Sequence, residues 1–499
     1  MKIFTSKQIK ELDQQTITEQ KISSLELMER AAQKCTRWLS NHFSTHTHFT
    51  LFCGLGNNGD DGLAIARMLI KKHYKIAVYV VQYDNKTSKD FKSNLDLLAK
   101  STQVHYLQSK EDFPCIAAHS VIIDSVLGVG LNRPLSGVCK YLIDFINSLK
   151  NIKIAIDIPT GLPSEIAGFH QENTILKADY TLTFEQPKLS FLLPETGSYV
   201  GQWKLLSINL SKKHKEKLAT DFFYLQAKDL IPIVKKRAAF SHKGTYGHTE
   251  LIGGSLGKMG AIVLATKASL KIGAGLATAH TPFCGMQILQ ISVPEAMWTG
   301  TADCEFYLAG VYKNQKKTIG IGPGMGTHPD TESFLLSVLQ TNQKPMVLDA
   351  DALNILAKNK NWISLIPKGS ILTPHPKEFE RLVGNFNSDY EKKQLLVEFA
   401  KKNQCIVVLK GAYTAIGNTD GTIYFNSTGN AGMATGGSGD VLTGMITGLL
   451  AQNYSPLHAA MIGVYIHGLA GDLAIKEQGM LSITATDLVK YIEKATLHI

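Results

Sequence analysis

Residues 49–72 read FTLFCGLGNNGDDGLAIARMLIKK, and this stretch decides the fold of the first half of the chain. The apolar run Phe49–Cys53 is typical of a buried strand, and the glycine-rich loop Gly54–Gly62 follows it directly. Leu63–Lys72 then has the apolar spacing of a helix. Glycines permit a tight turn, and the free backbone N–H groups at a helix start attract anions. The stretch therefore predicts a strand–loop–helix unit that binds phosphate.

Short β-branched runs recur along the rest of the first half and alternate with helical stretches. We expect a helical segment over 6–39 and further strands at 76–81, 121–126, 152–158, 180–184 and 205–210. Strands separated by helices indicate a mostly parallel sheet with helices on both faces. The first half is therefore predicted to be an α/β domain.

A second α/β pattern begins near residue 225, with expected strands at 248–252, 317–321, 345–349, 369–373 and 405–409. The lysine-rich stretch Leu210–Lys217 has little apolar periodicity, which is typical of a linker or of an exposed helix end. We place the boundary within 210–240 and expect domains at 1–215 and 225–499. The halves are not repeats of each other, so two different folds are expected.

Composition excludes several classes of protein. The 499 residues include 52 Lys and Arg against 42 Asp and Glu, a net charge of +10 with no dense basic block, so no nucleic-acid site is expected. Seven scattered cysteines without a CxxC pair argue against a disulfide framework and a structural zinc site. The first residues lack the apolar core of a signal peptide, and no long apolar run escapes interruption by glycines. We expect a cytoplasmic protein without a membrane span.

The loop CGLGNNGDDG, residues 53–62, does not fit the common phosphate-binding motifs. Asp60 stands where a Walker A loop requires Lys, and the match to GxGxxG is too short to be specific. Asn57, Asn58 and Asp61 make the loop more polar than a simple turn needs. A helix cap built from Asn and Asp side chains is the structural alternative.

Two more strands of the first half are expected to end in polar residues. Asp124 ends the strand in IIDSVLGVGLNRPLSG, and Asp157 ends the one in IKIAIDIPTGLP, with Thr160 close behind. The carboxyl ends of parallel strands line one ligand crevice, so these side chains should meet Asn58 there. Amide, carboxylate and hydroxyl oxygens without clustered Cys or His suit a hard cation.

The second half contains a similar loop, NSTGNAGMATGGSGDVLTG at 426–444, followed by an apolar helix over Met445–Ala451. A glycine-dense loop that opens a helix is expected to bind an anion, and Asp440 follows its last glycine. A flexible turn is the alternative. Asp349 and Asp351 end another expected strand, where they serve either as helix caps or in binding magnesium.

LELMERAA (25–32), CGLGNNGDDG, DSVLGVGLNRPLSG and DIPTGL resemble the NAD(P)H-hydrate epimerase domain across nearly all of residues 1–210. The resemblance implies a Rossmann-like, three-layer parallel-sheet domain that interconverts the R and S epimers of hydrated NAD(P)H, here NAD(P)HX, with bound K⁺. It implies K⁺ ligands Asn58, Asp124 and Thr160, and a catalytic Asp157 that faces the hydrated ring and transfers protons. It also implies substrate contacts at Asn57, Asn58, Gly59, Asp60, Asp61, Gly128, Val129, Gly130, Leu131, Asn132, Arg133 and Pro134.

Two positions depart from that pattern. Asp60 stands where the family usually has Gly, and Thr160 where Ser is commoner. Thr keeps the hydroxyl, so that change is mild. Asp60 either repels the diphosphate and weakens binding, or points outward without effect, which is the expectation we adopt.

HKGTYGHTELIGGSLGKMGA (242–261), GIGPGMG (320–326), VLDADALN (347–354), LTPHPKEFERL (372–382) and VVLKGAYT (407–414) resemble the NAD(P)H-hydrate dehydratase domain across 230–499. The resemblance implies a ribokinase-like α/β fold, with Asp440 as catalytic base. Substrate contacts would be Ala261, Gly326, His375 and Asp440. The adenine nucleotide would bind Lys410, Gly411, Ala412, Tyr413, Thr414, Asn430, Ala431, Gly432, Met433, Ala434, Thr435, Gly436, Gly437, Ser438 and Gly439. Lys377 stands where Gly is usual.

Together the two resemblances imply an enzyme that repairs hydrated NAD(P)H. One half would epimerise R- and S-NAD(P)HX, and the other would dehydrate the S epimer with ADP and Mg²⁺, releasing AMP and phosphate. The implied partners are these small molecules and further copies of the chain in a homo-oligomer. The alternatives are an ATP-dependent kinase of a small vitamin or sugar, and a nucleotide-binding sensor whose first half Asp60 inactivates.

Overall fold

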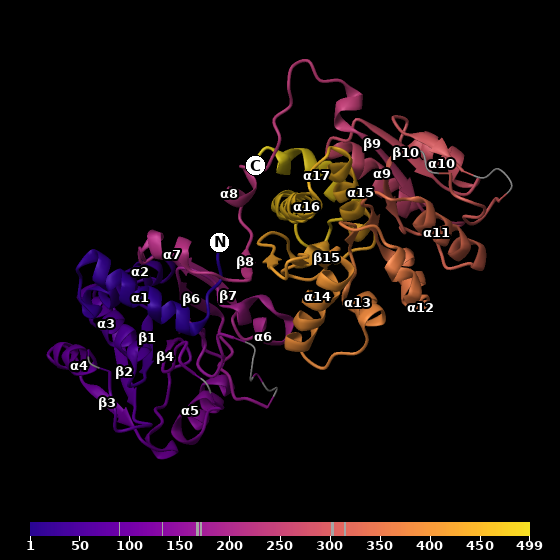
Figure 1. The fold of residues 1–499 in the computed structure, drawn as a ribbon. Coiled ribbons are helices and arrows are strands. Elements are labelled where there is room, and N and C mark those ends of the chain that lie inside the picture. Colours follow the sequence, from indigo (N-terminus) through magenta and orange to yellow (C-terminus); the bar gives the residue numbers. More distant parts are fainter. Residues whose placement is uncertain (89, 132, 166–168, 170–171, 301–303, 314–315) are drawn as a thin grey trace. The chain divides into compact units, whose positions relative to one another are not determined.

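A computed structural model describes the chain except residues 89, 132, 166–168, 170–171, 301–303 and 314–315 (Figure 1). The chain divides into an N-terminal unit, Lys2–Thr220, and a C-terminal unit, Asp221–Ile499 together with Met1. The division falls inside the 210–240 interval. Most of the expected linker is a short helix, α7 (Lys212–Lys217), whose first turn is capped by the Ser211 side chain. Of the two interpretations of this stretch, the helical one is therefore right.

The N-terminal unit contains a seven-stranded sheet in the order β3-β2-β1-β4-β5-β6-β7, with every pairing parallel. Its strands are β1 (His48–Cys53), β2 (Lys75–Val81), β3 (Val104–Leu107), β4 (Val121–Ser125), β5 (Lys153–Ile156), β6 (Tyr180–Phe184) and β7 (Gln202–Leu206). From β1 the strand order proceeds through β2 to β3 at one edge of the sheet, and from β4 it proceeds through β5 and β6 to β7 at the other edge. The order therefore reverses between β1 and β4, and such a switch point opens a ligand crevice outside the carboxyl ends of these two strands.

Helices cover both faces of this sheet: α1 (Ser6–Gln20), α2 (Ser24–His42), α3 (Asn57–Lys71), α4 (Phe91–Ala99), α5 (Gly137–Ser148) and the short α6 (Pro194–Gly197). Alternate residues of β1 point to opposite faces. Leu51 therefore joins the core under α2 and α3, whereas Phe52 joins the core under α5. Three layers result, and the predicted α/β class is confirmed.

Two predicted helices of this unit have different bounds in the structure. The segment 6–39 is two helices, because Lys21 takes a left-handed conformation after α1 and Ser23 starts α2 with a capping box. Helix α3 begins at Asn57 instead of Leu63. The predicted loop Gly54–Gly62 is therefore mostly the first turns of a helix, and only residues 54–56 are a turn.

The C-terminal unit contains a ten-stranded sheet in the order β11-β10-β9-β12-β13-β14-β15-β16-β17-β8, in which only β16 is antiparallel to its neighbours among the described strands. The strands are β8 (Phe222–Tyr224), β9 (His248–Ile252), β10 (Leu276–His280), β11 (Met297–Thr299), β12 (Thr318–Ile321), β13 (Val347–Leu348), β14 (Ile371–Leu372), β15 (Ile406–Leu409), β16 (Ala415–Gly417) and β17 (Ile423–Phe425). The strands predicted at 345–349 and 369–373 thus shrink to two residues each. In the first unit, the strand predicted at 205–210 overlaps only the end of β7.

The helices of this unit are α8 (Ala227–Leu230), α9 (Met259–Lys271), α10 (Gly285–Ser292), α11 (Pro329–Thr341), α12 (Ala350–Lys358), α13 (Pro376–Val383), α14 (Asp389–Asn403), α15 (Ser438–Ala451), α16 (Pro456–Gln478) and α17 (Ala485–Thr496). Helix α15 starts seven residues before the expected Met445. Helix α16 is long and apolar enough to cross a membrane by composition, but 67% of its apolar window is buried. It packs with α15 and α17 in a hydrophobic core of the unit, as a core helix does.

A glycine allows α15 to approach α9 closely. A Cβ atom added to Gly444 would lie 2.0 Å from the carbonyl oxygen of Ala265, so Gly444→Ala has to push the two helices apart. We expect this variant to lose about 1–3 kcal/mol of unfolding free energy. On α9, Gly260 has open space around an added Cβ, so Gly260→Ala should keep or raise the thermal midpoint. Equal midpoints for the two variants in thermal unfolding would contradict this packing.

Candidate functional site

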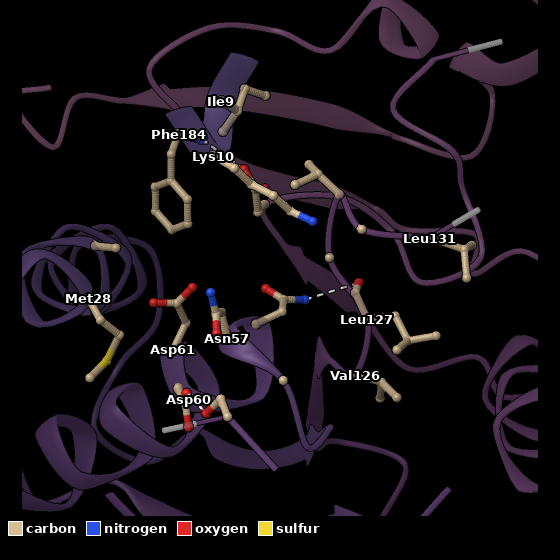
Figure 2. A pocket seen from close by; sticks show the side chains of 18 of the residues that line it. Ile9, Lys10, Met28, Asn57, Asp60, Asp61, Val126, Leu127, Leu131 and Phe184 are labelled. Atoms are coloured by element: carbon tan, nitrogen blue, oxygen red, sulfur yellow. Dashed lines mark hydrogen bonds between the residues drawn. The ribbon is translucent and has the colours of Figure 1, made fainter. Parts of the chain in front are cut away.

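A cavity of about 990 Å³ lies at the carboxyl edge of the N-terminal sheet (Figure 2). Its walls come from the start of α3, the loop after β4, the residue after β5 and the segment after β6, as the strand-end argument predicted. Helices α1 and α2 supply a further wall, with Lys10, Asp13 and Met28 among its residues. That contribution was missed, because helical spacing alone indicated only that these helices have a buried face.

The start of α3 is open to an anion. Gly56 is its N-cap, and no side chain caps the helix, so the predicted alternative of an Asn/Asp cap is wrong. A helix leaves its first N–H groups without intrahelical partners. Asn57 is exposed at the first position, and Figure 2 shows its side chain at the cavity. Gly59 is required for packing, because an added Cβ would lie 1.8 Å from Gly54 O.

The glycine loop after β4 lies beside the start of α3. A Cβ added to Gly128 would lie 3.2 Å from Asn58 Cβ, and one added to Gly130 would lie 3.7 Å from Lys10 Nζ. Figure 2 shows the Lys10 side chain extending into the cavity. The expected residues Val129, Leu131, Arg133 and Pro134 also line the cavity, whereas Asn132 lies outside the described residues. Helix start, glycine loop and lysine together form an electropositive wall.

Asn58, Asp124 and Thr160 come together, as predicted for a cation site. Asp124 is fully buried and accepts hydrogen bonds from Thr160 Oγ1 at 2.7 Å and Thr160 N at 2.8 Å. Burial raises the pKa of Asp124 to about 6, although these bonds oppose the rise. Asn58 donates to Leu127 O at 3.1 Å, while its buried Oδ1 has no partner. An unsatisfied acceptor among other oxygens fits an oxygen-preferring cation.

Asp157 reaches the cavity from the end of β5 and pairs with a buried lysine. It has a φ of 63°, and its carboxylate forms an ion pair with Lys188 and accepts from Phe184 N at 3.2 Å. The Lys188 side chain is only 1% exposed and also donates to Thr183 Oγ1 at 2.7 Å. This pair fixes the carboxylate at the cavity wall. Lys188 was missed, since no motif of the sequence analysis includes it.

Asp60 does not point outward, so the expectation of an outward, neutral side chain is wrong. It is 2% exposed and accepts a hydrogen bond from Ser88 Oγ, while its Oδ1 has no partner. Burial raises the pKa of Asp60 to about 6. Ser88 N in turn donates to Leu55 O at 2.9 Å. Asp60 therefore joins the start of α3 to the segment that follows β2.

Removing the partner of Asp60 should destabilise the N-terminal unit. Ser88→Ala leaves a buried carboxylate without a hydrogen bond, and we expect a loss of about 1–3 kcal/mol in unfolding free energy. Ser44→Ala is the matched control, because Ser44 is exposed in the same unit. Denaturant unfolding measures both variants. A Ser88→Ala protein as stable as the control would show that this hydrogen bond does not support Asp60.

Helix α15 of the C-terminal unit also starts without a side-chain cap. Helix α15 follows Gly437, whose φ of 89° favours glycine, and a Cβ there would lie 2.6 Å from Leu264 Cδ1. The predicted anion loop is therefore an ordered helix start, and the flexible-turn alternative is wrong. Asp440 lies in the first turn.

Asp440 lies beside a lysine and a buried aspartate. Lys410 Nζ is 3.0 Å from Asp349 Oδ1 and 3.9 Å from Glu378 Oε2. Asp349 is 1% exposed and also accepts from the hydroxyl groups of Thr373 and Thr443 at 2.8 Å each. Burial, followed by the charge of Asp349, raises the pKa of Asp440 to about 7, and Lys410 opposes the rise. A carboxylate with this pKa can exchange protons near neutral pH.

His375, expected to contact substrate, is the N-cap of α13. Its Nδ1 accepts from Lys377 N at 3.1 Å, and its own N donates to Glu378 Oε2 at 2.8 Å. Burial lowers the pKa of His375. Lys377 is exposed. The change from the usual Gly therefore lies at a solvent-facing position of the helix start.

The remaining predicted substrate contacts, Ala261 and Gly326, lie close together at the start of α9 and in the turn after β12. A Cβ added to Gly324 would lie 3.1 Å from Ala261 Cβ, and Gly326 N donates to Asp351 Oδ2 at 2.9 Å. Asp349 makes no side-chain cap to α12, so the cap interpretation fails for it. Its carboxylate instead binds Lys410 and two threonines.

Two residues of α16 hold the predicted nucleotide loop in place. Asp472 accepts from Gly429 N and from Asn430 Nδ2, each at 2.9 Å. Burial lowers the pKa of His467 to about 4, so the ring is neutral, and its Nε2 lies 2.9 Å from Ser438 O as a donor. The other segment predicted to bind the adenine nucleotide, Lys410–Thr414, lies next to this loop. A Cβ added to Gly439 would lie 3.3 Å from Lys410 Nζ. No motif in the sequence pointed to either α16 residue, because both lie far along the chain from the loop.

Comparisons with known proteins match both units. The family model described as YjeF-related protein N-terminus matches residues 24–190, and the one described as NAD(P)H-hydrate dehydratase matches 249–494. A protein of Coxiella burnetii named bifunctional NAD(P)H-hydrate repair enzyme Nnr is 34% identical over 98% of this chain and 98% of its own length. The protein of the same name from Moorella thermoacetica is 33% identical over 99% and 96%.

Among solved structures, the ADP/ATP-dependent NAD(P)H-hydrate dehydratase of Bacillus subtilis, co-crystallised with ATP and Mg²⁺, matches with a TM-score of 0.48 and 30% identity. The match covers 56% of this chain and 99% of that one.

Proposed function

The chain belongs to the family of bifunctional NAD(P)H-hydrate repair enzymes, and from this premise we propose which residues carry out each half of the repair. The protein is an NAD(P)H-hydrate epimerase and dehydratase. The kinase and sensor alternatives are set aside, because the family match extends over both units. A homo-oligomeric state and a cytoplasmic location stay predictions.

In the N-terminal unit, we propose that NAD(P)HX binds in the cavity with its diphosphate against the start of α3. The uncapped N–H groups of that helix, the glycine loop from Gly128 and the charge of Lys10 support this position. The hydrated ring then lies at Asp157, which exchanges the proton of the ring hydroxyl. The observation that carries this proposal is the Asp157 carboxylate, held at the cavity wall by the buried Lys188.

We propose that K⁺ is held by Asn58, Asp124 and Thr160. The unpartnered Oδ1 of Asn58 supports this, because it adds an amide oxygen to the carboxylate of Asp124 and the hydroxyl of Thr160. When bound, the ion would supply a positive charge next to the diphosphate. Asn58 donates to Leu127 O, and Leu127 N donates to Thr160 Oγ1. These two hydrogen bonds fix the start of α3 and the residues after β5 to the loop after β4.

A change at Thr160 tests the potassium site. Thr160→Val removes the hydroxyl, so we expect the variant to lose both the stimulation of epimerisation by KCl over NaCl and the rise in thermal midpoint that KCl gives. Thr160→Ser keeps the hydroxyl and should keep both effects. Chromatography of the two epimers and thermal unfolding supply the readouts. If Thr160→Val kept both the KCl stimulation and the KCl-dependent rise in thermal midpoint, Thr160 would not be a potassium ligand.

In the C-terminal unit, we propose that Asp440 takes the proton of the C6 hydroxyl of S-NAD(P)HX as that oxygen attacks the terminal phosphate of ADP. AMP leaves, and a poor leaving group becomes a phosphate ester. The lone pair of the ring nitrogen then expels phosphate, and loss of a C5 proton gives NAD(P)H. The uncapped N–H groups of α15 and the charge of Lys410 stabilise the phosphate oxygens.

Mg²⁺ bound with the nucleotide would neutralise phosphate charge, and we propose that no protein carboxylate cluster holds it. The carboxylates nearest Asp440 already have protein partners. Asp349 binds Lys410 and two threonines, and Asp351 accepts from Gly326 N and from Asn354 Nδ2 at 3.3 Å. These side chains therefore do not form an all-protein magnesium site.

Asp440 sets the expected pH dependence of dehydration. The carboxyl acts as a base only when ionised, and its pKa is about 7, so the rate should rise with pH through neutrality and fall below it. Asp440→Asn should lower ADP-driven recovery of NADH absorbance by about 10²–10⁴-fold. Epimerisation, at the other unit, is the internal control and should not change. A dehydratase rate in Asp440→Asn near that of the wild type would contradict the proposal.

A further inference from the structure

The epimerase cavity contains a carboxyl group that the proposal above does not use. Asp13 lies on α1 and lines the cavity together with Asp61, Asp157 and Lys188. The residue belongs to the helical wall that sequence analysis did not connect with the site. Three aspartates and one buried lysine thus face or adjoin the same space.

Lys188 alone cannot neutralise these three carboxylates, and the other cations of the cavity wall, Lys10 and Arg133, form no ion pair with them among the described contacts. Lys188 is bonded to Asp157 and to Thr183, so its charge is committed to Asp157. Burial and then the charge of Asp157 raise the pKa of Asp13 to about 7, with Glu185 adding to the rise and Lys188 opposing it. The pKa of Asp61 is raised well above its usual value, by burial and by the charges of Asp157, Asp60 and Asp13. Asp157 is therefore the member paired with a cation, whereas Asp13 can carry a proton near neutral pH.

Inversion at C6 of the hydrate needs an acid as well as a base. The carbon carries a hydroxyl and the ring nitrogen N1, so the ring is a cyclic hemiaminal. It can open to an aldehyde when the hydroxyl loses its proton and the C6–N1 bond breaks. The departing nitrogen needs a proton at that moment, since otherwise it leaves as an anion. Two carboxyl groups can supply this pair of transfers when one is ionised and accepts the hydroxyl proton, while the other is protonated and donates to the nitrogen.

We propose that Asp13 is the second catalytic residue of epimerisation, the acid that works with the base Asp157; this inference rests on the proposed function of the N-terminal unit. Asp157 takes the hydroxyl proton, C6=O forms, and the electron pair of the C6–N1 bond passes to N1, which takes the proton of Asp13. The aldehyde turns about C5–C6. N1 then attacks the other face of the carbonyl carbon, Asp13 takes back the N1 proton, and Asp157 returns its proton to oxygen.

This cycle leaves both carboxyl groups as they began and keeps the original oxygen on C6. It also avoids breaking the C6–O bond, the bond that the dehydratase reaction breaks. Asp61 is the competing candidate in the cavity. Burial and the neighbouring carboxylates hold the pKa of Asp61 well above its usual range, whereas the pKa of Asp13, about 7, favours proton transfer in both directions near neutral pH.

The test uses the full chain with pure R-NADHX and follows the appearance of the S epimer by chromatography. Asp13→Asn should lower kcat at least about 100-fold with KM within about threefold of wild type. The wild-type rate should fall above pH 7 as Asp13 loses its proton, and the residual rate of Asp13→Asn should lack that fall. Glu11→Gln, at an exposed position of the same helix, is the matched control and should behave as wild type. Dehydration of S-NADHX should be unchanged in every variant.

Wild-type kcat and an unchanged alkaline limb in Asp13→Asn would overturn the proposal, as would a 100-fold loss in Asp61→Asn without one in Asp13→Asn. Asp13→Glu keeps the acid and should retain far more activity than Asp13→Asn, which separates proton transfer from a folding defect. In H₂¹⁸O, the S epimer should form without ¹⁸O in its C6 hydroxyl group. Incorporation of one ¹⁸O per inversion would overturn the ring-opening step. A wild-type protein without epimerase activity would instead refute the proposed function itself.

Discussion

Both sites depend on one structural constraint: in each unit, a helix begins without a side-chain cap at the carboxyl edge of a parallel sheet. Gly56 and Gly437 occupy the two N-cap positions, and neither can bond to the N–H groups that follow. Unpaired N–H groups are costly unless water or an anion meets them. The same absence of a cap that leaves these helix starts unsatisfied lets phosphate approach the backbone. The proposed positions of diphosphate and nucleotide both follow from it.

Carboxylates with raised pKa values gather around these helix starts, and a lysine in each unit limits their repulsion. Lys188 pairs with Asp157 in one cavity, and Lys410 pairs with Asp349 beside Asp440 in the other. Groups that are desolvated but not fully neutralised keep pKa values near neutrality, where proton transfer is fastest. The two units, with different folds, therefore reach the same chemical condition by different residues.

The sequence predicted the parts of the site that lie in one continuous stretch. The strand–turn–helix at 49–72, the strand ends at Asp124 and Asp157, and the helix start before Asp440 were all found, because each is a local signal in apolar spacing and glycine. The missed residues, Lys10, Asp13, Lys188, His467 and Asp472, act through tertiary contacts with segments far away in the chain. Spacing within a helix shows which face is buried, not which polar residue at its edge meets a cavity.

Local errors have physical causes of the same kind. Asp60 was expected outside, but Ser88 from another segment binds it inside. Strands β13 and β14 are only two residues long, so their apolar runs gave the right place and the wrong length. Helices α3 and α15 start earlier than predicted, because glycine-rich sequence was taken for loop. In both, the polar residues assigned to the loop form the first helical turn.

The most direct measurement of the central claim, two separate sites that act in turn on one diffusing substrate, is a mixing experiment with pure R-NADHX and ADP. Asp157→Asn alone and Asp440→Asn alone should each restore little NADH beyond the spontaneous rate. Mixed in one tube, the two proteins should restore it fully, because each supplies the site that the other lacks. Failure of the mixture, with wild-type protein active under the same conditions, would contradict the account.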